Sequence, residues 1–362
     1  MSYVISQEKI LITGVTGYIG FKTLLIALER GYTIRALVRE EAHITDLQNK
    51  SAAIGAAVKA GRLEFIVVPD FLEQDAVLNA LQGITGVIHL ASPLAVQTEN
   101  YNADIIKPAV SMVTAFLEAA SRVTTVRRVV ITSSCVTLIP FEWNMNPDSE
   151  RIYTPADINP NLTSIPTSPM EAYWLSKALA RVAVQDFISI KDTPFDTIQI
   201  LPGVVIGPDE RLSPSLTNKH HSSAVLSGAR AAVLAPALTS DLNSPFPYVT
   251  VPVHVSDVAR AHVDALDFDK VPGRSEFILA ADTDNAGTGV NWDRDVRDIA
   301  RRCFPREFEG GILPCQGSLG SIRWKLDVGM TERVFGWRCE GFEEMAKGLL
   351  GQYLELRGLE TE

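Results

Sequence analysis

The segment that most constrains this chain is residues 9–20, KILITGVTGYIG. Its apolar residues predict a short buried strand, a glycine turn follows, and the pattern indicates a helix from about residue 18. Gly14, Gly17 and Gly20 have the spacing G-x-x-G-x-x-G. Such a turn lets the backbone approach a pyrophosphate closely, and the helix N-terminus adds N–H groups and partial positive charge. The segment therefore predicts a dinucleotide site, with three glycines in an ordinary turn as the plainer alternative.

Strand and helix patterns alternate through the first half of the chain, which is typical of a doubly wound parallel sheet. The 362 residues are enough for such a domain and an appended lobe. The predicted strands are residues 10–12, 32–38, 63–68, 86–90, 126–132, 195–201 and 276–280. The predicted helices are residues 18–30, 42–60 with an interruption at Gly55, 102–121 with a kink at Pro108, 170–190, 222–234, 254–266, 292–303 and 342–356.

Arg39 closes the second predicted strand, 19 residues after the last glycine of the turn. In a dinucleotide fold, a carboxylate at this point binds the ribose 2′-hydroxyl of NAD, whereas an arginine accepts the 2′-phosphate of NADP. Glu40 and Glu41 follow directly and weaken the argument. We predict NADP(H) as the cofactor, and a solvated arginine at a strand end is the alternative.

Composition excludes several classes of protein. The net charge of −10 argues against a nucleic-acid partner, because such affinity depends on clustered Lys and Arg. The sequence contains no run of about 18 apolar residues, so we expect no membrane span. The cysteines, at positions 135, 303, 315 and 339, form no C-x-x-C pair and fit the reduced thiols of a cytoplasmic protein.

Two groups of polar residues carry the predicted chemistry. Tyr173 and Lys177 form Y-x-x-x-K on a predicted helix, where residues four apart share one face. The ammonium is expected to lower the pKa of the phenol and make it a usable acid–base group. Ser133 and Ser134 follow the strand of residues 126–132, at the sheet edge where ligands bind. An exposed helix pair and serines that satisfy backbone groups are the alternatives.

Metal chemistry is not expected. His220 and His221 are adjacent, and His254 and His262 lie eight residues apart, which matches no zinc-binding spacing such as H-E-x-x-H.

These motifs together resemble the extended short-chain dehydrogenases/reductases, and most of all the group of dihydroflavonol reductases, cinnamoyl-CoA reductases and fungal aldehyde/ketone reductases. The segments that carry the resemblance are TGVTGYIG (13–20), HLASP (89–93), IKPAV (106–110), RRVVITSSCVT (127–137), EAYWLSKALA (171–180), LPGVVIGP (201–208) and VPVHVSDVARAHVDAL (251–266). The resemblance implies NADPH-dependent reduction of a carbonyl compound and a Rossmann domain with a smaller C-terminal α/β substrate lobe. We expect the NADP-binding domain at residues 1–201, with an active-site loop at 139–169. The substrate lobe is expected mainly at residues 202–362, with a segment at about 248–270 returning to the Rossmann core.

The resemblance also assigns roles to residues. Tyr173 is implied as the proton donor, Lys177 as its electrostatic partner and ribose anchor, and Ser134 as the donor that polarises the carbonyl, with Ser133 the less favoured serine. Asp70, after the third strand, is implied as an adenine contact, although a carboxylate there equally fits a helix cap. The implied cofactor-binding residues are Gly14, Thr16, Gly17, Tyr18, Ile19, Gly20, Arg39, Asp70, Phe71, Leu90, Ala91, Ser92, Thr132, Tyr173, Lys177, Pro202, Val204 and Val205.

One position departs from the family pattern, because Ser111 stands where relatives often carry an asparagine. We expect a small-molecule carbonyl partner, neither nucleic acid nor membrane, and a monomer or homodimer. The substrate stays open. An epimerase or dehydratase of the same superfamily and a non-catalytic NADP-binding regulator are the alternative functions.

Overall fold

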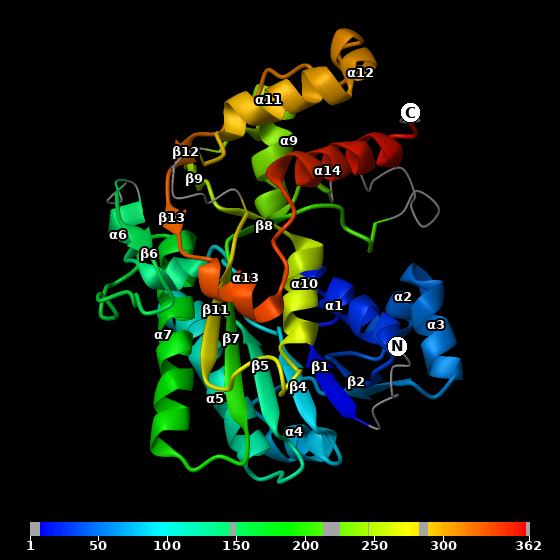
Figure 1. The fold of residues 1–362 in the computed structure, drawn as a ribbon, viewed down its shortest axis with the longest axis vertical. Coiled ribbons are helices and arrows are strands. Elements are labelled where there is room, and N and C mark those ends of the chain that lie inside the picture. Colours follow the sequence, from blue (N-terminus) through cyan, green and yellow to red (C-terminus); the bar gives the residue numbers. More distant parts are fainter. Residues whose placement is uncertain are drawn as a thin grey trace. The chain divides into compact units, whose positions relative to one another are not determined.

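A seven-stranded sheet with the strand order β11-β7-β5-β4-β1-β2-β3 forms the centre of the chain's larger part (Figure 1). The computed structural model describes residues 8–144, 146, 150–212, 225–244, 246–281 and 289–359. The strands of this sheet are β1 (Lys9–Thr13), β2 (Thr33–Val38), β3 (Leu63–Val67), β4 (Gly86–His89), β5 (Arg128–Thr132), β7 (Asp196–Pro202) and β11 (Ser275–Leu279). The expected doubly wound Rossmann-type α/β fold is thereby confirmed.

The order of the strands reverses between β1 and β4. From β1 the chain moves outward to β2 and β3, and it then returns to place β4 on the other side of β1. All strand pairs from β7 to β3 are parallel, and the carboxyl-terminal residues Thr13 and His89 are register partners. Ligands of open α/β sheets bind at the carboxyl ends of the strands where such an order reverses. The residues that follow β1 and β4 are therefore the place to look for a site.

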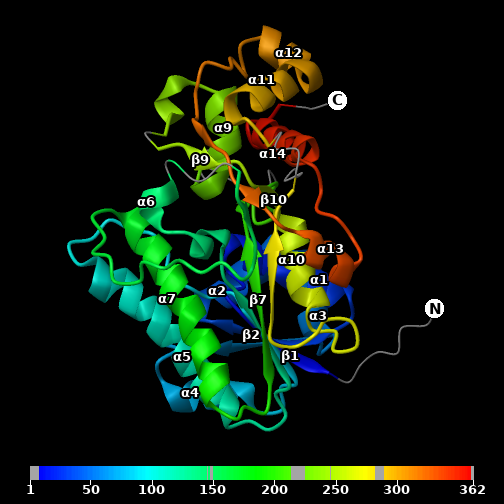
Figure 2. The ribbon, with the colours of Figure 1, turned by 60° about the vertical axis from the view of Figure 1, so that its left-hand side comes forward.

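Helices cover both faces of this sheet. Helices α4 (Gln74–Leu81), α5 (Lys107–Ser121) and α7 (Pro169–Ile190) pack against one another on one face, and α1 (Tyr18–Glu29) and α3 (Ala52–Lys59) lie on the other (Figure 2). A buried cluster that includes Leu11, Val87, Phe116 and Phe187 fills the first interface. Burial of this apolar area is the main stabilising contribution to the domain.

The turn between β1 and α1 is packed so tightly that it requires glycine. A β-carbon on Gly20 would lie 2.0 Å from the carbonyl oxygen of Gly14, and one on Gly14 would lie 2.9 Å from the backbone nitrogen of Ala91. Gly14 also has a φ of +75°, which side chains disfavour. The glycines thus bring α1, the turn and the chain after β4 into backbone contact.

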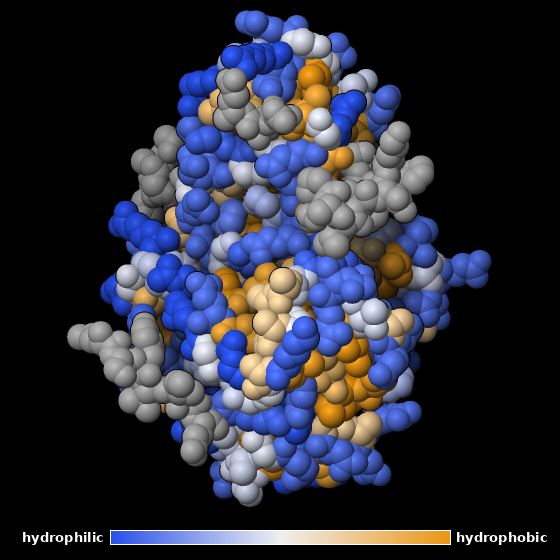
Figure 3. Space-filling view, turned by 90° about the vertical axis from the view of Figure 1, so that its right-hand side faces the viewer, coloured by the Kyte–Doolittle hydropathy of each residue, from blue (hydrophilic) through white to orange (hydrophobic). Residues whose placement is uncertain are grey.

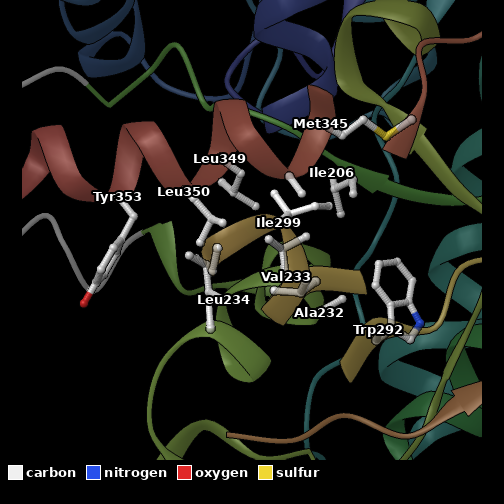
Figure 4. Close-up of a cluster of buried hydrophobic side chains, with 14 of the residues drawn as sticks. Ile206, Ala232, Val233, Leu234, Trp292, Ile299, Met345, Leu349, Leu350 and Tyr353 are labelled. Atoms are coloured by element: carbon white, nitrogen blue, oxygen red, sulfur yellow. The ribbon is translucent and has the colours of Figure 1, made fainter. Parts of the chain in front are cut away.

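A second compact unit comprises residues Glu142–Ala156, Pro202–Val258 and Ile278–Glu362, and the first comprises Met1–Phe141, Asp157–Leu201 and Ala259–Phe277. In the second unit, α9 (Ala231–Ala237), α11 (Trp292–Cys303) and α14 (Phe342–Leu356) enclose a core of aliphatic side chains and Trp292 (Figure 4). The other α-helices and strands that the structure describes in this unit are α6 (Phe141–Asn144), α12 (Pro305–Glu309), α13 (Gly329–Phe335), β6 (Ile152–Tyr153), β8 (Val204–Ile206), β9 (Tyr248–Val249), β10 (Pro252–His254), β12 (Ser321–Ile322) and β13 (Lys325–Leu326). Helix α10 (Val255–Asp264) contributes to both units. The domain boundaries expected from the sequence stay a prediction.

Several predicted elements differ from the observed ones. The helix predicted over residues 42–60 is two helices, α2 (Ala42–Lys50) and α3, and the break falls at Ser51 in an extended conformation instead of at Gly55. The helix predicted over residues 102–121 begins as a π-helix (Asn102–Ile106) that runs directly into α5, and Pro108 lies just after this change of helix type. The predicted loop at 139–169 contains α6 and β6, and β6 pairs with β13 from a distant part of the chain. The helix predicted at 222–234 lies partly outside the described residues. His220 and His221 lie outside them as well.

Hydrophilic residues cover most of the face shown in Figure 3, and hydrophobic side chains gather between them in patches. No helix within the described ranges is long and apolar enough to cross a membrane.

We predict that Gly20→Ala destabilises the first unit by about 1–3 kcal/mol, because the added methyl group overlaps the Gly14 carbonyl. Urea unfolding followed by circular dichroism measures the change. Gly55→Ala is the matched control, since it lies within α3 with no atom within 4 Å of the new methyl group. Alanine there is expected to be neutral or slightly stabilising. Equal stability of the two variants would contradict the close-packing argument.

Candidate active site

The N-terminus of α1 faces the turn after β1 without a capping side chain. Its N-cap residue is Gly17, whose N–H donates to the Gly14 carbonyl over 2.9 Å. A β-carbon on Gly17 would meet only that carbonyl oxygen, at 3.2 Å. Thr16 lies in the turn, and Tyr18 and Ile19 begin the helix. The space beside Gly17 and the positive end of the helix suit an anion such as a pyrophosphate.

The hydroxyl of Thr13 joins the ends of β1 and β4. Its Oγ1 accepts hydrogen bonds from the N–H groups of Leu90 and Ala91, both over 3.1 Å. It also lies 3.1 Å from Nδ1 of His89, to which its own proton is free to donate. Burial lowers the pKa of His89 to about 3, and the charge of Lys177 contributes. His89 is therefore a neutral packing residue that fixes the edge of the sheet.

Three residues predicted to contact the adenosine half of the cofactor have different environments. Arg39 is exposed at the end of β2. Oδ1 of Asp70 accepts a hydrogen bond from the N–H of Leu72 over 2.9 Å, so this carboxylate stabilises a local turn. The ring of Phe71 is buried and lies edge-on to that of Phe116, with 6.4 Å between the ring centroids. Their contact with a cofactor stays a prediction.

The serines after β5 are both buried but differ in their partners. Ser134 is the N-cap of a 3₁₀-helix (Cys135–Leu138), and its Oγ accepts from the N–H of Val136 over 3.3 Å. Within the described residues, Oγ of Ser133 has no hydrogen-bond partner although it is buried. Thr132, at the end of β5, lies with its Oγ1 2.7 Å from Nε2 of the buried His262. Sequence reasoning considered His262 only as a metal ligand and missed this contact.

Tyr173 and Lys177 lie one turn apart on α7 and have separate partners. Nζ of Lys177 donates to Oγ of Ser92 over 3.1 Å and lies 5.9 Å from the centre of the Tyr173 ring. Burial lowers the pKa of Lys177 to about 8. Ser92 follows β4, so this hydrogen bond connects the helix to the edge of the sheet where the strand order reverses.

The expectation that Lys177 lowers the pKa of Tyr173 is wrong for this structure. Tyr173 is partly exposed as a whole residue, but desolvation of its hydroxyl group raises its pKa to about 12, and the nearby Cys135 adds to the shift. A hydrogen bond with the Ser134 side chain acts in the opposite direction. The phenol thus keeps its proton at neutral pH, and the structure brings Ser134 and Tyr173 together.

The remaining predicted residues lie in β7, β8 and α5. Pro202 ends β7, and Val204 and Val205 form part of β8, which pairs in parallel with β10. Ser111, at the position where relatives often have asparagine, lies in α5.

Comparison with known proteins identifies the family. Residues 10–279 match the NAD dependent epimerase/dehydratase family. Ketoreductase CTB6 of Cercospora nicotianae is 31% identical over 363 residues, which cover 97% of this chain and 96% of the relative. Dihydroflavonol 4-reductase of Arabidopsis thaliana is 30% identical over 286 residues, which cover 74% of this chain and 64% of the relative.

Among solved structures, yeast methylglyoxal/isovaleraldehyde reductase Gre2 in complex with NADPH has the same fold, with a TM-score of 0.76 at 21% identity over 97% of this chain and 99% of that one. The names of these relatives support an oxidoreductase. The chain belongs to the NAD dependent epimerase/dehydratase family, the extended short-chain dehydrogenases/reductases.

Proposed function

We propose that this protein is an NADPH-dependent carbonyl reductase with Tyr173 as the proton donor. Its substrate is a small or medium-sized ketone or aldehyde of the secondary-metabolite kind. The observation that carries the proposal is the meeting of Ser134, Tyr173 and Lys177 at the carboxyl edge of the sheet. The ketoreductase and reductase names of the relatives support it.

The residues present fit a dinucleotide. The glycine turn and the N-terminus of α1 would receive the pyrophosphate. The exposed guanidinium of Arg39 would pair with the 2′-phosphate, and Lys177, anchored by Ser92, would hold the nicotinamide ribose hydroxyls. When bound, the cofactor supplies the hydride, and the protein orients the reacting groups.

Tyr173 is suited to donate a proton in this reaction. Because its pKa is about 12, it is protonated across the neutral range, and an alkoxide that forms on a carbonyl carbon is a stronger base. The Ser134 side chain lies close enough to Tyr173 to affect the pKa of the phenol, and both hydroxyl groups can rotate so that each donates to one carbonyl oxygen when a substrate is bound. Two fixed donors at the oxygen that gains charge are the largest contribution expected to lower the barrier.

Exposed apolar side chains lie close in sequence to Ser92 and Tyr173 and favour an apolar substrate. Leu94 is 74% exposed and Val96 51%, and they lie two and four residues after Ser92. Met170, 43% exposed, precedes Tyr173 by three residues and so lies near the same face of α7. Apolar groups gathered around a few convergent polar groups are typical of a small-molecule site.

We predict that Tyr173→Phe lowers turnover of a carbonyl substrate on the order of 10²–10⁴-fold, because it removes the proton donor. NADPH absorbance with a panel of aldehydes, diketones and larger ketones measures turnover and net cofactor consumption. Tyr32→Phe is the control, since it removes the hydroxyl of another tyrosine whose pKa burial raises, just before β2. Near-normal turnover of the Tyr173 variant would refute the assigned role, and a lack of net NADPH consumption would favour an epimerase.

Lys177 predicts a pH dependence. Its pKa of about 8 means that the ammonium is charged below this pH and neutral above it, so turnover in the direction of reduction should fall as the pH rises through about 8. Rates measured between about pH 6 and about pH 10 show the decline. Lys177→Arg keeps the charge throughout, so its profile should lack the decline even if its rate is lower. A decline that persists in this variant would point to another group.

Arg39 predicts the cofactor preference. Arg39→Ala should weaken the binding of NADPH about 10- to 100-fold and leave that of NADH unchanged, because a hydrogen bond to a charged group is worth about 1.5–3 kcal/mol. Fluorescence titration with both nucleotides measures the two affinities. Arg122→Ala, which removes an exposed arginine after α5, is the control. A parallel loss for both nucleotides would contradict contact with the 2′-phosphate.

A further inference from the structure

Helix α7 carries a second buried charged group on the face that holds Tyr173 and Lys177. Arg181 lies four residues after Lys177, and its side chain is fully buried. Its guanidinium forms an ion pair with Glu276 on β11, whose side chain is 14% exposed. Removing these charges from water is energetically costly, and a well-packed apolar pair is often as stable. The stability of the fold alone therefore does not explain this ion pair, and a role in positioning other groups is the alternative.

The guanidinium also reaches the loop that begins with Ser134. Nη1 of Arg181 donates to Oγ1 of Thr137 over 3.1 Å and to the carbonyl oxygen of Asp157 over 2.9 Å. Oγ1 of Thr137 in turn donates to the carbonyl oxygen of Ser134 over 2.8 Å. A continuous chain of hydrogen bonds thus leads from Glu276 to the backbone of Ser134.

Glu276 is held on its other side by two amides. The side-chain nitrogens of Gln185, on α7, and Gln199, on β7, donate to its Oε1 over 2.9 and 2.6 Å. Both carboxylate oxygens accept from Nε of Arg181 over 3.2 Å. One helix and two strands therefore fix the orientation of the Arg181 guanidinium. This leaves the guanidinium little freedom to move away from Thr137.

A second contact ties the same loop to α7. Nε1 of Trp174 donates to the carbonyl oxygen of Ile139 over 2.9 Å. Hydrogen bonds to Thr137 and to Ile139 consequently bind the loop that carries Ser134 to the helix that carries Tyr173. Both hydroxyl groups must meet one substrate oxygen, and a misplacement of about 1 Å can cost on the order of 10²-fold in rate.

We propose that Arg181, held by Glu276, is a positioning residue that sets the place of Ser134 relative to Tyr173 through Thr137. The inference rests on the proposed reductase function, in which Ser134 and Tyr173 both donate to the carbonyl oxygen. Under this inference Arg181 contributes to the reaction although it contacts neither the substrate nor the cofactor.

The decisive variant is Thr137→Val, which removes the connecting hydroxyl and leaves the Arg181–Glu276 ion pair in place. We expect kcat to fall about 10- to 100-fold with KM little changed, because the donor is misplaced while substrate binding is retained. Thr137→Ser keeps the hydroxyl and should keep kcat. In a Ser134→Ala background, Thr137→Val should have no further effect on kcat, because it acts through Ser134.

Arg181 itself is tested by the double variant Arg181→Met with Glu276→Gln, which leaves no unpaired buried charge. Its kcat should fall as in Thr137→Val, and adding Thr137→Val should lower it no further. Arg128→Lys is the matched control: Arg128 is a buried arginine paired with Asp196 at the opposite end of β5, and its loss should change stability but not kcat.

The outcomes separate the two proposals. A normal kcat for Thr137→Val, or an undiminished further loss in the Ser134→Ala background, would overturn the positioning role alone. A normal kcat for Ser134→Ala would overturn the proposed donor arrangement together with the inference that depends on it.

Discussion

The burial of charged groups on one face of α7 is the constraint on which the geometry of this site depends. A charged side chain that leaves water needs partners that replace its hydration. Lys177 finds Oγ of Ser92 after β4, and Arg181 finds Glu276 on β11 and Thr137 after β5. Each contact ends at a different part of the sheet. These contacts fix the rotation of α7 about its axis and its position along that axis relative to the sheet. The position of Tyr173 follows from this placement of the helix.

The sheet supplies a complementary frame at the point where its strand order reverses. The Thr13 hydroxyl binds the chain after β4, and Gly14 comes so close to Ala91 that a side chain at that glycine is excluded. Ser92 follows one residue later and receives Lys177. The glycine turn and the α7 face are thus connected through only a few residues after β4. This connection is what would join the proposed phosphate-binding turn and the proposed proton donor, far apart in sequence, in one site.

Local sequence signals predicted much of this arrangement. The strand–turn–helix at residues 9–20 was recognisable because its glycines are required by local backbone contacts, and α11 and α14 were predicted with their observed bounds. Helix α7 begins after Ser168, whose Oγ accepts from the N–H of Glu171, and Pro169 occupies its first turn.

Features that depend on distant partners were not predictable in the same way. The two-residue strand β6 exists only through its pairing with β13, and the break at Ser51 has no glycine or proline to signal it. Arg181 looks like any helical arginine in the sequence. The one available signal was its spacing of four residues from Lys177, which places it on the buried face, and Glu276 could not be identified as its partner from the sequence alone.

The spacing of Tyr173 and Lys177 alone predicted that the pKa of Tyr173 is lowered, whereas in the structure it is raised. The Y-x-x-x-K pattern places an ammonium near the phenol, but the shift depends on the balance between that charge and the loss of water. In this structure burial dominates, and Lys177 directs its ammonium to Ser92, 5.9 Å from the centre of the phenol ring. A phenol with a pKa of about 12 is a poor base and a ready donor near neutral pH. In the proposed reaction this asymmetry favours protonation of a carbonyl oxygen over removal of a proton from an alcohol, so the burial that raises the pKa of Tyr173 also suits the site to reduction.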